Sequence, residues 1–234
     1  MKNKFIVVFS LILATTLVIS IIINYEAIIQ SVFSQNNTYC HTVIVDAGHG
    51  GFDGGASAPD GTAEKDINLL IAQNLRDFLT HFGFNVIMTR TEDVSTESEN
   101  AKNNKKYSDL NNRLKIMKEN PNAIYVSIHM NKFTSTSANG AQVFYAHKIK
   151  NSDLLAQSIQ DNIKNQLQNN NNRVIKQGTK NIYILKNATI PATIVECGFI
   201  SNPQELKLLK DENYQRKMAF SIFCGIIDYH NSIR

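Results

Sequence analysis

Two histidines and two glutamates stand where residue type and local pattern could support hydrolytic chemistry. His49 follows the β-branched run at 43–45 and enters a glycine-rich stretch, while His129 and Glu196 each follow another short apolar run. We interpret these runs as buried strands, and parallel strands bring their carboxyl ends to one sheet edge, where open α/β sheets keep their active sites. Glu64 lies in the first turn of the helix expected after the glycine-rich loop, which is long enough to return it to that edge. We therefore expect the four side chains to converge.

Two histidines and one carboxylate, with a fourth position left open, are typical of a catalytic zinc site. Zinc lowers the pKa of a bound water to about 7 and polarises a carbonyl group. The remaining carboxylate would then be the general base, taking a proton from the water and passing it to the leaving amine. Spacing alone leaves open whether Glu64 or Glu196 is the ligand.

Each of these residues also has an ordinary structural explanation. A histidine at the end of a strand is commonly a satisfied polar residue, and Glu64 could simply favour a helix N-terminus. Glu196 could be a buried ion-pair partner, for which Arg113 is a plausible mate. Four such coincidences at one edge are less frequent than any one of them, so the pattern favours a metal hydrolase, although no H-E-x-x-H motif is present.

Other classes of function lack support. The glycines after His49 do not have the spacing of a phosphate-binding or dinucleotide-binding loop, and no G-x-S-x-G motif exists. The net charge of +4 is mild and no dense Lys/Arg patch occurs, so we expect no nucleic-acid partner. The odd number of cysteines (Cys40, Cys197 and Cys224) and the absence of C-x-x-C predict structural cysteines.

The elements that must position these residues follow from hydrophobic periodicity and breakers. Strands are expected at 43–45, 84–90, 123–128, 142–146, 182–185 and 193–195. Amphipathic helices are expected from helical apolar periodicity at 67–82, with Glu64 in the first turn of that helix, and at 110–118, 154–167 and 217–229; another starts at Pro203 behind an Asn202 cap. Gly83 is expected to end the first helix in a left-handed conformation. Strands alternating with helices predict an α/β fold with a mostly parallel central sheet flanked by helices on both faces.

The chain of 234 residues begins with a segment unlike the rest. Residues 5–23 carry no charge, glycine or proline, and as a helix they would span roughly 28 Å, which matches a hydrocarbon core. Lys2 and Lys4 precede this run, so the positive-inside rule places the residues after the run outside the cytoplasm. We expect a transmembrane signal-anchor at 1–25, favoured over a cleaved signal peptide, a polar tether at 26–41, and a single catalytic domain at 42–234.

Four stretches together resemble the zinc-dependent N-acetylmuramoyl-L-alanine amidases, the amidase-3 family. They are V-D-A-G-H-G-G at 45–51 with Asp53, E-K-D-I-N at 64–68, S-I-H-M-N at 127–131 and V-E-C-G-F-I-S-N at 195–202. The similarity runs in order through residues 42–231, and G-A-Q-V-F-Y at 140–145 and I-Y-I-L-K-N at 182–187 extend it to the sporulation-type cortex-maturation branch. Met130 departs from the smaller residue usual in relatives. Inserted autoinhibitory helices and wall-binding repeats are not recognised.

The resemblance implies a role for each candidate. His49, Glu64 and His129 would be the Zn²⁺ ligands and Glu196 the catalytic carboxylate. The reaction implied is hydrolysis of the amide between the lactyl group of N-acetylmuramic acid and L-alanine in peptidoglycan, serving muramic-lactam formation in the spore cortex. We therefore expect an extracytoplasmic protein, membrane-anchored or exported, in the spore envelope, with an accessory activating protein as a further expectation.

Two alternatives remain open at this level. The same metal site could cut a peptide bond within the stem, as an endopeptidase or carboxypeptidase does. The fold could also serve a non-catalytic wall-binding protein, which would be expected if a ligand or Glu196 were missing, and all four are present.

Overall fold

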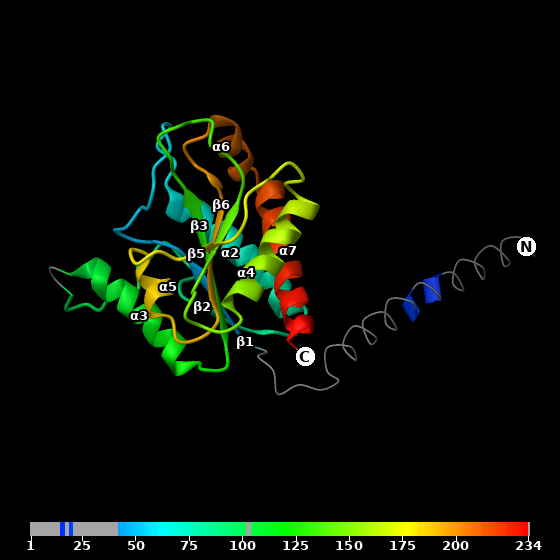
Figure 1. Ribbon diagram of the computed structural model, residues 1–234, viewed down its shortest axis with the longest axis horizontal. Coiled ribbons are helices and arrows are strands. Elements are labelled where there is room, and N and C mark those ends of the chain that lie inside the picture. Colours follow the sequence, from blue (N-terminus) through cyan, green and yellow to red (C-terminus); the bar gives the residue numbers. More distant parts are fainter. Residues whose placement is uncertain (1–14, 17–18, 21–41, 102–103, 234) are drawn as a thin grey trace, which may run out of the picture. The chain divides into compact units, whose positions relative to one another are not determined.

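The fold is built on a six-stranded sheet with the strand order β2-β1-β3-β6-β4-β5 (Figure 1). The computed structural model describes residues 15–16, 19–20, 42–101 and 104–233. β1, β2, β3 and β6 run parallel, whereas β4 is antiparallel to β6 and parallel to β5. The strands are β1 (Thr42–Ala47), β2 (Asn85–Met88), β3 (Ile124–Asn131), β4 (Gln142–Tyr145), β5 (Lys176–Gln177) and β6 (Ala192–Phe199).

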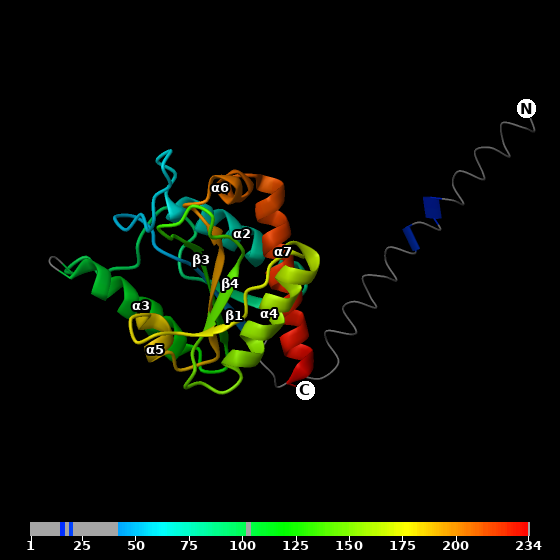
Figure 2. The ribbon, with the colours of Figure 1, turned by 45° about the horizontal axis from the view of Figure 1, so that its top comes forward.

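Helices cover both faces of the sheet (Figures 1 and 2). One face packs against α2, α4 and α7, and the opposite face packs against α3 and α5. α6 contacts the end of β6 and the start of α7. The helices are α2 (Glu64–His81), α3 (Lys105–Glu119), α4 (Ser152–Gln166), α5 (Tyr183–Asn187), α6 (Pro203–Leu209) and α7 (Glu212–Ser232).

The alternation of side chains along β3 determines which face carries the chemistry. Val126 and Ile128 are buried in the apolar cluster beneath α2, α4 and α7, while Tyr125 is buried in the smaller cluster beneath α3 and α5. Side chains two residues apart on a strand share a face. His129 therefore continues the row of Tyr125, and it lies at the carboxyl end of the strand, on the face covered by α3 and α5.

The predicted fold class is confirmed, but one expected strand is wrong and one strand was not expected. Residues 182–185, expected as a strand, form the short helix α5, which buries Ile184 and Leu185 against the sheet. The edge strand there is instead β5, which pairs with β4 and was not anticipated. A four-residue apolar run cannot separate a strand from a helical turn by periodicity alone, so tertiary packing decides between them.

Helix boundaries were predicted unevenly. Gly83 has φ +85° and its N–H donates to the Thr80 carbonyl, as expected of a left-handed helix end. α6 begins at Pro203, and the Asn202 side chain accepts hydrogen bonds from the amides of the first turn, so this start is confirmed. α3 begins at Lys105 rather than at residue 110. The earlier start was missed because the first turn is exposed and carries no apolar periodicity.

The chain divides into a unit at 1–38 and a unit at 39–234. The expected anchor at 1–25 and tether at 26–41 fall outside the described residues, apart from 15–16 and 19–20. Within the described part of the chain, no helix combines the length and the apolar character needed to cross a bilayer.

Candidate metal centre

His49 is presented by the turn that follows β1. The Gly48 amide donates to the Ile128 carbonyl at 3.1 Å, so the turn stays paired to β3 beyond the last residue of β1. His49 itself has φ +62°, a conformation that costs energy for a residue with a side chain. This backbone turns the His49 imidazole toward Glu64, with 3.3 Å between His49 Nε2 and Glu64 Oε2.

Glu64 is the first residue of α2 and is almost fully buried, with 3% of its surface exposed. Its Oε2 accepts a hydrogen bond from the Ala56 amide at 2.8 Å, and its Oε1 accepts one from the Met130 amide at 3.0 Å. Both carboxylate oxygens are therefore held by backbone on opposite sides of the site. His129 Nδ1 lies 3.0 Å from Oε1.

His49, Glu64 and His129 thus form one cluster, in which a donor atom from each residue lies within 4.8 Å of the others. Two imidazole nitrogens and a carboxylate oxygen are the donor set of catalytic zinc sites, and three protein ligands leave a coordination position for substrate or water. Asp53 Oδ2 lies 3.0 Å from His49 Nδ1 and occupies that nitrogen. Metal-binding histidines commonly donate their second ring N–H to a carboxylate in this way. The residues present therefore fit a metal ion.

The protonation of this metal-free cluster follows from its charges. Burial disfavours a charged imidazole, but the hydrogen bonds from His49 to Asp53 and Glu64 outweigh it and raise the pKa of His49 to about 9. Burial also opposes ionisation of Glu64, yet hydrogen bonds from His129 and His49 hold the pKa of its carboxyl well below the usual range. Glu64 therefore carries a negative charge inside the protein, which suits a cation at this position.

Glu196 lies beside the cluster because of strand register. β3 pairs with β6 so that His129 is opposite Glu196, and directly paired residues project to the same face. Within the described residues, its buried Oε2 atom has no hydrogen-bond partner. Burial raises the pKa of Glu196 to about 7, while the charges of His129, Glu64 and His49 modulate that value. A carboxyl with such a pKa and a free oxygen is suited to accept and return a proton near neutral pH.

Two glycines leave the space that the cluster occupies. A Cβ on Gly48 would lie 2.3 Å from His129 Nε2, and a Cβ on Gly55 would lie 2.6 Å from both Glu64 Oε2 and the His49 ring. Gly55 also has φ +68°, which disfavours any side chain. Glycine is therefore needed at both positions to leave room for the side chains of His49, Glu64 and His129, and not only to form the turn.

A buried charge network behind the cluster holds the His49 turn. Arg113 donates to the carboxylate of Asp46 and, at 2.8 Å, to the His49 carbonyl, while Arg90 donates to the carbonyls of Ala47 at 2.8 Å and Gly48 at 3.1 Å. Burial disfavours the Asp46 carboxylate, yet Arg113 and hydrogen bonds from Ser127, Tyr125 and Thr89 hold its pKa far below the usual range. Two arginine cations thus fix three successive carbonyls.

This network corrects one expectation. Arg113 was a candidate partner for Glu196, but it pairs with Asp46 and with Asp109, on its own helix. The structural alternative for Glu196 is therefore removed. Sequence reasoning did not assign the supporting roles of Asp46 and Arg90; the only available signal was the unusual aspartate inside the apolar strand run.

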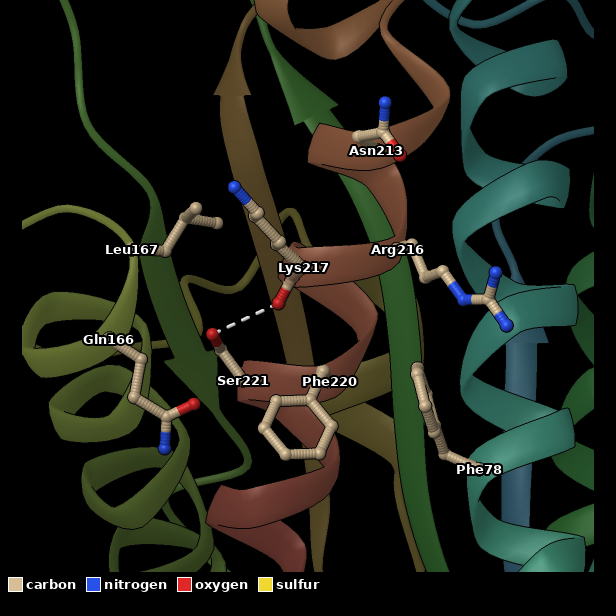
Figure 3. Close-up of a pocket in the computed structure, with 8 residues that line it drawn as sticks. All are labelled: Phe78, Gln166, Leu167, Asn213, Arg216, Lys217, Phe220 and Ser221. Atoms are coloured by element: carbon tan, nitrogen blue, oxygen red, sulfur yellow. Dashed lines mark hydrogen bonds between the residues drawn. The ribbon is translucent and has the colours of Figure 1, made fainter.

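The structure has further hollows that contain none of the four candidate residues. The cavity in Figure 3, of about 620 Å³, lies between α2, the end of α4 and α7. Phe78 and Phe220 are among its apolar walls, and Arg216 and Lys217 are its cations. The metal cluster is separate, at the carboxyl edge of the sheet.

Comparison with known proteins places this geometry in context. A family model described as N-acetylmuramoyl-L-alanine amidase matches residues 43–228. The germination-specific N-acetylmuramoyl-L-alanine amidase of Bacillus subtilis is 38% identical over 189 residues, covering 80% of this chain and 78% of that protein. The CwlD amidase from Clostridioides difficile, solved in complex with the GerS lipoprotein, is 42% identical with a TM-score of 0.78, covering 82% of this chain and 99% of that one. An N-acetylmuramoyl-L-alanine amidase from Clostridium difficile 630 is 30% identical with a TM-score of 0.73, covering 83% and 99%.

Proposed function

Because this chain belongs to the N-acetylmuramoyl-L-alanine amidase family, we propose that it hydrolyses the amide joining the lactyl group of N-acetylmuramic acid to L-alanine. The observation that carries this proposal is the three-donor cluster of His49, Glu64 and His129 with Glu196 next to it on the neighbouring strand. An amide is a poor electrophile with a poor leaving group. Its hydrolysis therefore needs an activated water and a proton donor, and the cluster and Glu196 can supply these functions.

The ion proposed for the cluster is Zn²⁺, held by His49, Glu64 and His129. The mixture of imidazole and carboxylate donors suits zinc, whereas Mg²⁺ and Ca²⁺ prefer all-oxygen sites. When bound, zinc would lower the pKa of water and polarise the scissile carbonyl. Asp53 would keep His49 Nδ1 protonated, so that Nε2 faces the ion.

Glu196 is the proposed catalytic carboxylate. Its Oε2 atom has no partner among the described residues and is therefore available to accept the proton of the attacking water. Burial, which raises the pKa of Glu196 in the metal-free protein, then favours return of that proton from the same carboxyl to the departing amine of L-alanine. Glu64 is less suited to this role, because both of its oxygens already accept backbone hydrogen bonds and its pKa is held low.

We also propose a place of action. The relative from Bacillus subtilis is germination-specific, which supports a role in maturing the spore cortex, outside the cytoplasm. The Clostridioides difficile relative was solved with a lipoprotein, which supports an accessory envelope protein as partner of this chain. Residues 1–25 would tether the domain to the cytoplasmic membrane, because two lysines precede a long run without charges.

The test combines zinc content with product analysis on intact peptidoglycan for the full chain and for Glu196→Gln. We expect the wild type to release stem peptides with a free L-alanine amino terminus and to leave peptide-free muramic acid. Glu196→Gln should bind one zinc per chain and lose activity by about 10²–10⁴-fold. Glu212→Gln, at an exposed position on α7, makes the same chemical change away from the site and should retain full activity.

Three results would count against the proposal. Cleavage within the stem, with the L-alanine amide intact, would indicate an endopeptidase or carboxypeptidase. A Glu196→Gln variant that retains activity would remove the assigned role of this residue. A zinc-loaded wild type that binds peptidoglycan without cleaving it, with or without envelope extract from sporulating cells, would support the wall-binding alternative.

A further inference from the structure

A groove of about 330 Å³ lies next to the candidate site, on the side away from β1. It is formed by the ends of β3 and β6, by β4 and by the segment leading into β5. The lining residues are Asn131, Phe133, Gln142, Phe144, Arg173, Lys176 and Phe199, together with Ala138. The lining thus combines two cations with aromatic walls and contains no carboxylate.

Strand register connects this groove to the catalytic residues. β6 pairs with β3 on one side and with β4 on the other, so that Glu196 is opposite both His129 and Gln142. The three side chains therefore form one row on one face, with neighbouring strands about 4.8 Å apart. The groove begins at Gln142, one strand beyond Glu196.

Arg173 is held in a fixed orientation at the end of this row. Its guanidinium carbon lies 4.5 Å from the centre of the Phe199 ring, its Nε donates to the Asn139 carbonyl at 2.6 Å, and its Nη1 donates to Gln142 Oε1 at 3.2 Å. Such a stacked, hydrogen-bonded guanidinium loses little freedom when it binds an anion. Among the described residues, no hydrogen bond engages its Nη2.

No carboxylate neutralises Arg173 directly. Within the described part of the chain, Arg173 forms no ion pair. Glu205 is near enough to feel its charge, but the Glu205 oxygens accept hydrogen bonds from the amides of Gly140 at 2.9 Å and Phe199 at 2.7 Å. The groove therefore holds an oriented arginine with an unused N–H donor, and carboxylates, like phosphates, are anions that a guanidinium binds in planar geometry.

On the basis of the proposed amidase function, we propose that Arg173 binds the free α-carboxylate of the second stem residue. In peptidoglycan this residue is a D-glutamate joined to L-alanine and extended through its γ-carboxyl, so its α-carboxylate is left as a side group. One residue spans at most about 3.6 Å, which places that carboxylate roughly 6–7 Å from the scissile nitrogen. Gln142, to which Arg173 donates a hydrogen bond, lies one strand spacing of about 4.8 Å from Glu196, so this reach is of the right order for Arg173 to meet the carboxylate. Arg173 would thus be a specificity residue on the leaving-group side.

The test uses glycan strands with tripeptide stems in two forms, one with the α-carboxylate of the second residue free and one with that group converted to an amide. The zinc-loaded full chain should show kcat/KM about tenfold higher for the carboxylate form, as expected for one charge-assisted contact. Arg173→Gln should lower kcat/KM for the carboxylate form to the amide level and leave the amide form unchanged. Arg173→Lys should restore part of the preference.

Arg216→Gln is the matched control, since it removes the same charge at the exposed cavity of Figure 3. It should keep the full preference. A stem amidated at the third residue instead of the second should be cleaved with the same kcat/KM as the unmodified stem. If amidation of the third residue lowers kcat/KM and amidation of the second does not, the assignment is overturned. Equal loss on both substrates in Arg173→Gln would show a purely structural role and would also overturn it.

Failure of the amidase function itself gives a different result. If the wild type cleaves neither form, the free tripeptides are titrated into the zinc-loaded chain and binding is measured by calorimetry. Tighter binding of the carboxylate peptide that disappears in Arg173→Gln supports the inference without any turnover. Equal binding of both peptides refutes it.

Discussion

Gly48→Ala should weaken metal binding while leaving the free energy of unfolding almost unchanged. Gly48 lies between the end of β1 and His49, and its backbone is not in the left-handed region, so alanine can adopt its conformation. The added Cβ would nevertheless lie 2.3 Å from His129 Nε2, where ordinary contacts are 3.4–4 Å. Arg90 donates to the Gly48 carbonyl and the Gly48 amide donates to Ile128. The imidazole therefore has to move, because the backbone is held.

The size of the effect follows from these distances. The His129 ring must shift by about 1 Å, whereas metal–ligand distances tolerate about 0.2 Å. Loss of supporting contacts around a ligand already costs about 10–100-fold in affinity, so displacement of the ligand itself should cost roughly 100-fold or more, about 2.7 kcal/mol. The fold should change little. An off-rotamer side chain costs about 0.5–1.5 kcal/mol, and replacing glycine by alanine returns about 0.4–1 kcal/mol through the unfolded chain.

Gly54→Ala is the control, since a Cβ on Gly54 meets nothing within 4 Å in the same loop. Zinc affinity would be measured by chelator competition, and the free energy of unfolding by urea titration of the metal-free proteins. We expect Gly48→Ala to lose zinc and hydrolysis while unfolding within about 1 kcal/mol of wild type, and Gly54→Ala to match wild type in both. Wild-type zinc affinity in Gly48→Ala, or equal loss in both variants, would refute the assignment of His129 as a ligand.

Three further predictions concern charge and capping. Asp46→Asn should destabilise the fold by about 3 kcal/mol in urea titrations at pH 7, because Arg113 loses one of its two buried carboxylate partners, and the difference from wild type should shrink as the pH falls below about 4. Zinc affinity of the wild type should rise between pH 6 and 8, because the metal displaces a proton from His49, whose metal-free pKa is about 9; a flat profile by chelator competition would contradict this. Asn202→Ala should cost about 0.5–2 kcal/mol in thermal unfolding, since Asn202 Oδ1 accepts from the amides of Gln204 and Glu205, and wild-type stability would show that solvent replaces the cap.

The sheet and its two helical faces could be predicted because short apolar runs alternate with longer segments of helical apolar periodicity. The runs ending at His49, His129 and Glu196 become β1, β3 and β6, which are adjacent in the order β1-β3-β6. The run at 182–185 was misassigned because its side chains suit either a covered strand or a buried helical turn. Its helical form depends on packing against the α3 face, including the Tyr183 hydroxyl bond to Asn111 at 3.0 Å, and no local pattern encodes that contact.

The convergence of the metal-binding residues could be predicted from strand topology, but their supporting contacts could not. The register that places Glu196 opposite His129 depends on how β6 is inserted between β3 and β4. For the same reason the partner of Arg113 could not be inferred, since Asp46 and Glu196 lie on different strands of the same face. Sequence spacing does not distinguish these two carboxylates, and the packing of α3 against the sheet determines that Arg113 pairs with Asp46.

The order of the strands divides the chemistry between two halves of the chain. The three metal-binding candidates come from the turn after β1, from α2 and from β3, all before residue 130, whereas Glu196 and Arg173 come from segments after residue 170. Under the proposed role of Arg173, substitutions in the second half of the chain would alter substrate choice without changing the metal-binding residues of the first half. Under the proposed role of Glu196, a single substitution of this residue on β6 would leave a protein that holds the metal and binds the glycopeptide without cleaving it.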